Sequence, residues 1–294
     1  MPEQPRLFVL GNASIDTTLN VPRLPAAGET LMATGIRRSP GGKGLNQAVM
    51  AARSGARVHF CAPLGTEPET AILRDALAAE GLAEVLLPDV GQPTDLSSLM
   101  VAPDGENCIV STGACADALT AAHAEAFLAG MRPGDMLLMQ GNLSLAVTRM
   151  AASQAARVLL NTAPLRWDYA AVLERCEVVI ANRSEAASLT GLDDPAAAAS
   201  RLAAGGCAIV TLGAAGCVVA DGGVTTRPAV SATAVDSSGA GDVFCGVLAA
   251  CLLRDLSLAD GVTAAQRAAA VSVGRAGCYP SFPGRAEMAA IIGR

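Results

Sequence analysis

The segment Asp236–Asp242 is the strongest candidate for chemistry in this chain, because its sequence Asp-Ser-Ser-Gly-Ala-Gly-Asp combines carboxylates with small residues. Small residues let the backbone turn tightly and approach a ligand closely. An apolar helical run over residues 243–253 follows at once, so the free N–H groups of residues 239–242 would open a helix and form an anion site. The alternative is a glycine-rich turn in which Asp242 only caps the helix. A short glycine motif is weak evidence, so residue types alone leave both interpretations open.

A second glycine-rich turn occupies Ser39–Ala48, with the sequence Ser-Pro-Gly-Gly-Lys-Gly-Leu-Asn-Gln-Ala. It also leads into a helical pattern, and its Lys43 and Asn46 could face a pocket. It is not a Walker A loop, because the spacing differs and no Ser or Thr follows the lysine. The alternative is an ordinary helix start with a solvated lysine.

A third candidate is the pair Asn182 and Glu185, which follows an apolar run over residues 178–180. Residues three apart share one face of a helix's first turn. Both side chains offer hard oxygen ligands to Mg²⁺, directly or through water. The alternative is a capping arrangement in which Glu185 reaches back to the start of the helix.

Composition excludes several functional classes. A content of 51% hydrophobic residues rules out a disordered chain. The net charge of -6 and the lack of a basic cluster argue against nucleic acid or a membrane as partner. We expect no signal peptide, because no charged leader precedes a long apolar run, and no apolar run reaches the roughly 18 residues of a spanning helix. These observations predict a soluble cytoplasmic protein.

The nine cysteines and two histidines form no recognisable metal or redox motif. The cysteines show neither a CxxC pair nor zinc-ligand spacing. Most lie in apolar runs such as residues 207–210, where a thiol behaves as a small hydrophobe. His59 and His123 are too far apart in sequence to suggest a His-based metal site. We therefore expect the cysteines to be core residues.

The elements that must position these motifs alternate along the chain. Short apolar runs predict strands, and helix-like segments separate them, which favours a mostly parallel sheet covered on both faces. The predicted strands are 7–10, 58–61, 136–139, 158–160, 178–180 and 209–212. The predicted helices are 45–53, 118–129, 145–155, 185–190, 195–204, 240–254 and 258–275.

Two further segments, residues 29–38 and 98–112, look like strands with polar residues on one side, and Pro103-Asp104-Gly105 interrupts the second. They predict a small second sheet that forms a lid over a ligand and excludes water. Since we find no internal repeat and no long linker, we expect a single domain over residues 1–294, with lid strands from about 16–38 and 96–112. Open strand edges and apolar side chains on the lid predict a homodimer through it; these side chains are Leu31, Ile36, Leu99 and Ile109.

Together these motifs resemble those of the PfkB, or ribokinase-like, family of carbohydrate kinases. The resemblance covers essentially the whole chain and is closest to the ribokinases within that family. It rests on Gly41–Asn46, Asn182-x-x-Glu185, Thr211–Gly213 and Gly239–Asp242, and for the ribokinases on Gly11–Asp16, Asn161–Pro164 and Gly277–Ser281. It implies a ribokinase-like α/β fold, with a central mostly parallel sheet, flanking helices and a small β-sheet lid. It also implies ATP-dependent transfer of the γ-phosphate to a hydroxymethyl oxygen of a pentose or related sugar.

The resemblance also assigns roles to individual residues. Asp242 would be the catalytic base that takes a proton from the sugar hydroxyl, beside an anion hole made by the N–H groups of Gly239, Ala240 and Gly241. The sugar-side residues would be Ser14, Asp16, Gly42, Lys43, Asn46, Asn142 and Asp242. The ATP-binding residues would be Asn182, Thr211, Gly213, Gly216 and Gly241. Glu185 would organise Mg²⁺ through water. The potassium ligands would be Asp236, Ser238 and Ser281, although Asp236 could instead only brace its loop.

Two positions depart from the ribokinase pattern. Ser14 stands where ribokinases usually carry Asn, and Asn142 stands where they carry Glu, which weakens the case for D-ribose as the sugar. Arg183, where many relatives carry Glu, could alter magnesium handling.

Three other functions remain to be weighed. A nucleoside kinase of the same family is the nearest alternative, but five Phe, two Tyr and one Trp offer few residues for stacking on a base. A non-catalytic sugar-binding regulator would not need Asp242. A Rossmann dehydrogenase would need a GxGxxG turn after the first strand, and Gly11-Asn12-Ala13-Ser14 is not one.

Overall fold

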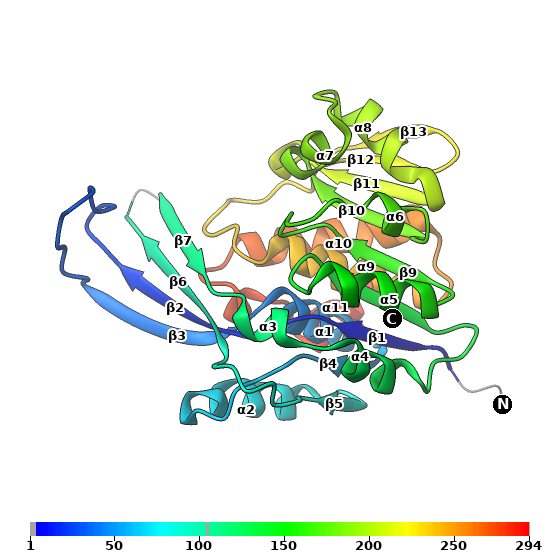
Figure 1. The fold of residues 1–294 in the computed structure, drawn as a ribbon. Coiled ribbons are helices and arrows are strands. Elements are labelled where there is room, and N and C mark those ends of the chain that lie inside the picture. Colours follow the sequence, from blue (N-terminus) through cyan, green and yellow to red (C-terminus); the bar gives the residue numbers. More distant parts are fainter. Residues whose placement is uncertain (1–3, 104–105, 294) are drawn as a thin grey trace.

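The computed structural model describes residues 4–103 and 106–293. A large β-sheet, the main sheet, runs through the body of the protein (Figure 1). Its strand order is β13-β12-β11-β10-β9-β8-β1-β4-β5. The strands are β1 (Arg6–Leu10), β4 (Arg57–Cys61), β5 (Glu84–Leu86), β8 (Met136–Gln140), β9 (Val158–Asn161), β10 (Val178–Asn182), β11 (Cys207–Thr211), β12 (Cys217–Ala220) and β13 (Val224–Arg227). Every pair of neighbouring strands from β5 to β11 is parallel, whereas the pairs β11–β12 and β12–β13 are antiparallel. The expected mostly parallel sheet is confirmed.

Helices cover both faces of this sheet and give it two apolar cores. Successive residues of a strand point to opposite faces, so Leu7 and Val9 of β1 enter one core while Phe8 and Leu10 enter the other. The first core is completed by α1 (Lys43–Arg53), α2 (Ala71–Glu80), α9 (Ala240–Leu253), α10 (Leu258–Val273) and α11 (Arg285–Ile292). The second is completed by α3 (Ala114–Ala118), α4 (Ala121–Leu128), α5 (Leu145–Gln154), α6 (Ala170–Leu173), α7 (Arg183–Thr190) and α8 (Pro195–Leu202).

Each strand and helix predicted for the body of the protein is observed, with shifts at its ends. The elements without a predicted counterpart are β5, β12, β13, α2, α3, α6 and α11. The helix expected over 118–129 is α4, which begins only at Ala121, because the Thr120 side chain accepts a hydrogen bond from the N–H of His123 and caps the helix. The strand expected to reach Leu212 ends at Thr211, and Leu212 instead precedes the short 3₁₀ turn Gly213–Ala215.

A second sheet of order β3-β2-β6-β7 projects from the body as the expected lid (Figure 1). Its strands are β2 (Ser14–Asn20), β3 (Gly35–Gly41), β6 (Asp95–Val101) and β7 (Asn107–Ser111). The strand expected over 29–38 begins only at Gly35, because Glu29 is held in a turn by an ion pair with Arg23 and by the N–H of Ala26. The expected turn residues Asp104 and Gly105 lie outside the described residues.

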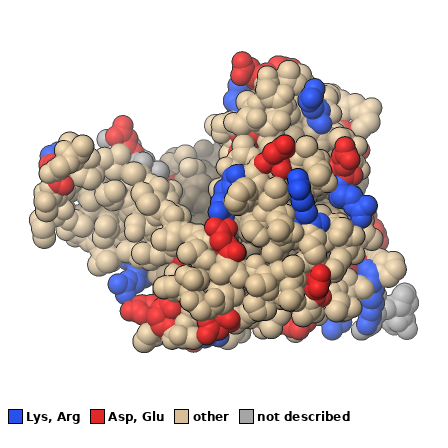
Figure 2. Space-filling model, viewed as in Figure 1, with Lys and Arg blue, Asp and Glu red and all other residues tan. Residues whose placement is uncertain are grey.

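Both faces of the lid carry exposed apolar side chains. Ile36 and Val110, each 64% exposed, lie on one face, and Ile109, 52% exposed, lies on the other, because successive strand residues point to opposite faces. Leu31 and Leu99 are half-buried. In the view of Figure 2 the lid surface carries few charged side chains, and a recess separates the lid from the upper part of the body.

The close crossing of α1 and α9 determines where the two glycine-rich turns meet. Gly246 lies at the crossing, where a Cβ atom would collide with the carbonyl oxygen of Gln47. Only a glycine lets the two backbones approach this closely. The crossing therefore places the first turn of α9, with Asp242, against the first turns of α1.

Two expectations from composition can be compared with the structure. Within residues 4–103 and 106–293, no helix is both long and apolar enough to cross a membrane. The nine cysteines are free thiols, of which Cys108 is exposed, Cys278 is half-buried and the other seven are buried.

Candidate active site

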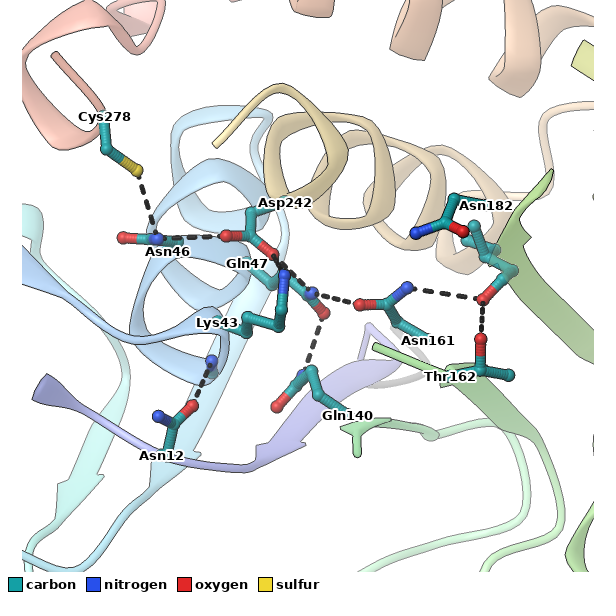
Figure 3. Close-up of polar contacts among 12 residues, drawn as sticks. Asn12, Lys43, Asn46, Gln47, Gln140, Asn161, Thr162, Asn182, Asp242 and Cys278 are labelled. Atoms are coloured by element: carbon teal, nitrogen blue, oxygen red, sulfur yellow. Dashed lines mark hydrogen bonds and ion pairs between the residues drawn. The ribbon is translucent and has the colours of Figure 1, made fainter. Parts of the chain in front are cut away.

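Asp242 is a buried carboxylate, only 5% exposed, in the first turn of α9. Its Oδ2 accepts a hydrogen bond from Asn46 Nδ2 at 3.0 Å, and its Oδ1 accepts one from Gln47 Nε2 at 2.9 Å (Figure 3). Lys43 Nζ lies 3.8 Å from Oδ1. The negative charge of Asp242 raises the pKa of Lys43, although burial opposes this. A partnered, buried carboxylate of this kind can take a proton at a fixed position.

The turn before Asp242 begins α9 as predicted. Gly239 is the N-cap, in the left-handed conformation with φ 77°, and a Cβ there would collide with the Cys278 side chain. Helix N-termini present N–H groups and positive partial charge to an anion. The N–H of Ala240 points to the Ser237 carbonyl oxygen at 3.3 Å. The first turn of α9 thus lies immediately beside the carboxylate.

A second carboxylate, Asp16 on β2, lies close enough to Asp242 for their charges to interact. Ser14 Oγ donates to Asp16 Oδ1 at 3.1 Å, and both residues are buried. Burial is the main reason that the pKa of Asp16 rises to about 6, and the negative charge of Asp242 adds to it. Hydrogen bonds from Ser14 and Ser97 oppose the rise only in part. The lid therefore contributes an acceptor whose charge state changes just below neutral pH.

Two predicted sugar-side residues carry buried polar atoms without a hydrogen-bond partner among the described residues, Oδ1 of Asn46 and Oδ1 of Asn142. Asn142 follows β8, and its carbonyl oxygen accepts from Arg166 Nη1 at 2.8 Å. Gly42 is the N-cap of α1. Because buried polar atoms are nearly always hydrogen-bonded, the two amide oxygens are suited to accept hydrogen bonds from a bound ligand.

A cavity of about 610 Å³ lies at the ends of β10 and β11. Its size is that of a small-ligand pocket. Its lining includes Asn182, Thr211 and Gly213, three of the residues predicted to bind a nucleotide. Gly216 is not part of this lining; it ends the 3₁₀ turn at φ 95°, against the carbonyl of Arg227.

Asn182 and Glu185 adopt the capping arrangement that the sequence left open. Asn182 Oδ1 accepts from the Glu185 N–H at 2.9 Å, and Glu185 Oε2 accepts from the Asn182 N–H at 3.0 Å. Thr162 Oγ1 also donates to Glu185 Oε2 at 3.0 Å. In the part of the chain that the structure describes, no cluster of three or more His, Cys, Asp or Glu side chains could hold a metal. A single carboxylate fits Mg²⁺ that keeps most of its ligands as water and phosphate oxygens.

Asp236 ties the turn before α9 to the segment after α10. Its Oδ1 accepts from the Ser238 N–H and its Oδ2 from the Gly277 N–H, both at 2.9 Å. Burial raises the pKa of Asp236, but these two hydrogen bonds bring it below the ordinary value. Ser281 is fully buried nearby in the chain, and its Oγ lies 2.6 Å from Ser272 Oγ and 2.7 Å from the Cys278 carbonyl oxygen. Asp236 therefore braces the loop through two backbone N–H groups.

Comparison with known proteins agrees with this geometry. Residues 4–285 match the pfkB family of carbohydrate kinases. A ribokinase from Haemophilus influenzae is 33% identical over 294 residues, which cover 96% of each chain.

The chain belongs to the pfkB carbohydrate kinase family. Its fold is that of the ribokinases: a Thermotoga maritima ribokinase structure superimposes with a TM-score of 0.88 at 26% identity, covering 99% of this chain and 100% of the other. A ribokinase from Arabidopsis thaliana, solved with ribose and ATP, has a TM-score of 0.86 at 23% identity and covers 99% and 100% of the two chains.

Three buried amides of the pfkB site were missed as functional candidates. Gln47 contacts Asp242, Asn161 and Gln140 (Figure 3). The signal that could have found Gln140 and Asn161 is a polar side chain at the carboxyl end of an apolar strand, because parallel strands of an α/β sheet bind ligands at that edge.

We expect Asp16→Asn to stabilise the protein above about pH 6. The folded protein holds the proton of Asp16 more tightly than an ordinary Asp with pKa 3.8. Folding of the wild type therefore carries a penalty that is complete above about pH 6 and absent below about pH 4. The Asn variant should gain up to about 3 kcal/mol in free energy of unfolding at pH 8, since one pKa unit corresponds to about 1.4 kcal/mol.

Urea denaturation at about pH 8 and pH 4 measures this gain, with the exposed Asp75→Asn as control. A gain of equal size at both pH values would contradict the assignment of the penalty to the Asp16 charge.

Proposed function

We propose that this protein is an ATP-dependent kinase that transfers the γ-phosphate of ATP to a hydroxymethyl oxygen of a pentose or closely related sugar. The observation that carries the proposal is the buried carboxylate of Asp242. It lies in the first turn of α9 and accepts hydrogen bonds from Asn46 and Gln47. Membership of the pfkB carbohydrate kinases and the similarity to proteins named ribokinase support it.

In this proposal Asp242 takes the proton from the sugar hydroxyl as its oxygen attacks the phosphorus atom. The N–H groups at Gly239–Gly241 stabilise the negative charge on the phosphoryl group, because preorganised dipoles act most strongly in a site without water. Lys43, 3.8 Å from Asp242 Oδ1, adds positive charge beside the reacting atoms. The lid covers the sugar and limits transfer to water.

The cavity at Asn182, Thr211 and Gly213 is where we propose that ATP binds. Its volume of about 610 Å³ is suitable for a nucleotide's base and ribose. Glu185, placed by the cap at Asn182, is positioned to hold Mg²⁺ through water. Bound Mg²⁺ would neutralise charge on the phosphate oxygens. The same proposal places the enzyme in the cytoplasm, where ATP is available.

The identity of the sugar depends on Ser14, Asp16, Asn46 and Asn142. The unpartnered Oδ1 atoms of Asn46 and Asn142 are acceptors for sugar hydroxyl groups, which favours a free sugar over the flat apolar base of a nucleoside. Neutral Asn142 replaces a carboxylate of typical ribokinases, so we propose a pentose or related sugar and do not restrict it to D-ribose.

We also propose that a potassium ion binds beside the anion site. Asp236 supports this, because its ionised carboxylate joins the turn at Ser238 to the segment at Gly277. Ser281 adds a buried hydroxyl on the same segment. Such oxygen donors are those that a hard cation prefers. A cation there would hold the turn so that its N–H groups point at the developing charge.

A homodimer through the lid completes the proposal. The exposed Ile36 and Val110 lie on one face of the lid and offer an apolar surface that a second lid could cover.

We expect Asp242→Asn to abolish turnover while sugar and nucleotide still bind. The carboxylate acts on the hydroxyl proton in the transition state, so its loss lowers kcat and leaves affinity nearly unchanged. Steady-state kinetics and calorimetric titration with ATP and a turned-over pentose measure both effects. A variant that keeps more than a few percent of the wild-type rate would remove Asp242 from the mechanism.

We expect the rate to fall several-fold when potassium is replaced by sodium or a bulky organic cation at constant ionic strength. Asp236→Ala should remove this dependence, because it removes the charged ligand. Equal rates in potassium and in the organic cation would show that the turn is organised without an ion.

We expect a dimer at micromolar concentration, and Ile36→Asp together with Val110→Asp should yield monomers, because burying two charges in the interface is unfavourable. Solution scattering gives the mass. A monomeric wild type would refute the dimer and leave the kinase proposal untouched.

A further inference from the structure

Three side-chain amides lie buried behind the Asp242 carboxylate. Gln47 on α1 and Gln140 at the end of β8 are 0% exposed, and Asn161 at the end of β9 is 7% exposed. In Figure 3 Gln47 lies in the middle of the group, with Asp242, Asn161 and Gln140 around it. Burying three amides is unfavourable unless each finds hydrogen-bond partners, so the contacts among them must compensate for the burial.

Gln47 uses its whole amide in this group. Its Nε2 donates to Asp242 Oδ1 at 2.9 Å and to Asn161 Oδ1 at 3.2 Å. Its Oε1 accepts from Gln140 Nε2 at 2.8 Å. An amide nitrogen carries two hydrogens, so both are used. If the amide rotated by 180°, its oxygen would face two acceptors, the Asp242 carboxylate and the Asn161 oxygen.

Asn161 fixes that orientation from β9. Its Nδ2 donates to the Ile180 carbonyl oxygen at 3.3 Å. Because a backbone carbonyl can only accept, the Oδ1 of Asn161 must face Gln47. Gln140, from β8, supplies the donor that the Gln47 oxygen then requires, while its own Oε1 is buried without a hydrogen-bond partner among the described residues.

We propose that Gln47, Gln140 and Asn161 form a positioning network that holds the carboxylate of Asp242 in the orientation needed to remove the substrate's proton. This inference rests on the proposed kinase function. Gln47 touches the carboxylate directly, whereas Gln140 and Asn161 act through Gln47. With Asn46 on Oδ2, the network leaves the carboxylate no freedom to rotate.

The test compares Gln47→Met, Gln140→Met and the exposed control Gln154→Met, with ATP and a pentose that the wild type phosphorylates. Methionine keeps the length of the side chain and removes its amide. For Gln47→Met we expect kcat to fall by roughly 10- to 100-fold, as misplacement of a reacting group does, with KM for the sugar nearly unchanged.

Gln140→Met leaves every group that touches Asp242 in place, so it separates positioning from contact. We expect a smaller fall in kcat, again with KM nearly unchanged, because Gln47 loses one of the two amides that it contacts. Gln154→Met should match the wild type. Wild-type kcat in Gln140→Met and in a folded Gln47→Met would overturn the proposal. If Gln47→Met does not fold, the result for Gln140→Met decides alone.

A second readout is independent of turnover. In protein labelled with ¹³C at the aspartate carboxyl groups, the Asp242 signal is assigned by its absence in Asp242→Asn. At one fixed pH its chemical shift should change in Gln47→Met and, by less, in Gln140→Met, and should stay the same in Gln154→Met. If the wild type phosphorylates no sugar, the proposed function fails, while this comparison still decides the network. An unchanged Asp242 signal in both amide variants would overturn the network even in an active kinase.

Discussion

A buried carboxylate needs partners, and this requirement at Asp242 organises the rest of the structure. A charge removed from water is costly unless hydrogen bonds and an opposite charge compensate it. The side-chain hydrogen bonds and the ion pair that compensate it come from α1, through Lys43, Asn46 and Gln47. It is available only because Gly246 lets α9 approach the α1 backbone closely. The contact between two helices in the core is thus also the contact that assembles the reactive group.

The second carboxylate, Asp16, gives the lid an electrostatic link to the body. Its pKa rises mainly through burial and additionally through the charge of Asp242, while the charge of Lys43 lowers it. Lys43 therefore interacts with both acids. A ligand whose hydroxyl groups donate to Asp16 would lower the free-energy cost of its buried charge.

Several polar groups serve the architecture and the candidate chemistry at once. Asn182 and Glu185 form a complete capping box at α7, and Asn182 also lines the cavity at the ends of β10 and β11. Asp236 accepts hydrogen bonds from backbone N–H groups of two loops beside the first turn of α9. This double use has a common cause: helix N-termini and strand ends gather unpaired N–H groups, which attract both structural caps and ligands. A cap and a ligand site are therefore alternatives that residue types cannot separate.

The sequence by itself determined six strands of the main sheet, most of the helices and the two glycine-rich turns, because apolar runs and glycines act locally. It did not determine β5, β12 and β13, which lie at the two edges of the sheet. It pointed to Asp242, Lys43 and Asn46, but not to the contact of Gln140 and Asn161 with Gln47 beside Asp242. Only the tertiary structure decided these contacts: Gln47 and Asp242 are 195 residues apart, and a hydrogen bond over such a separation leaves no periodicity in either segment. Whether a buried amide has only a structural role or also a catalytic one depends on which partner the fold brings to it.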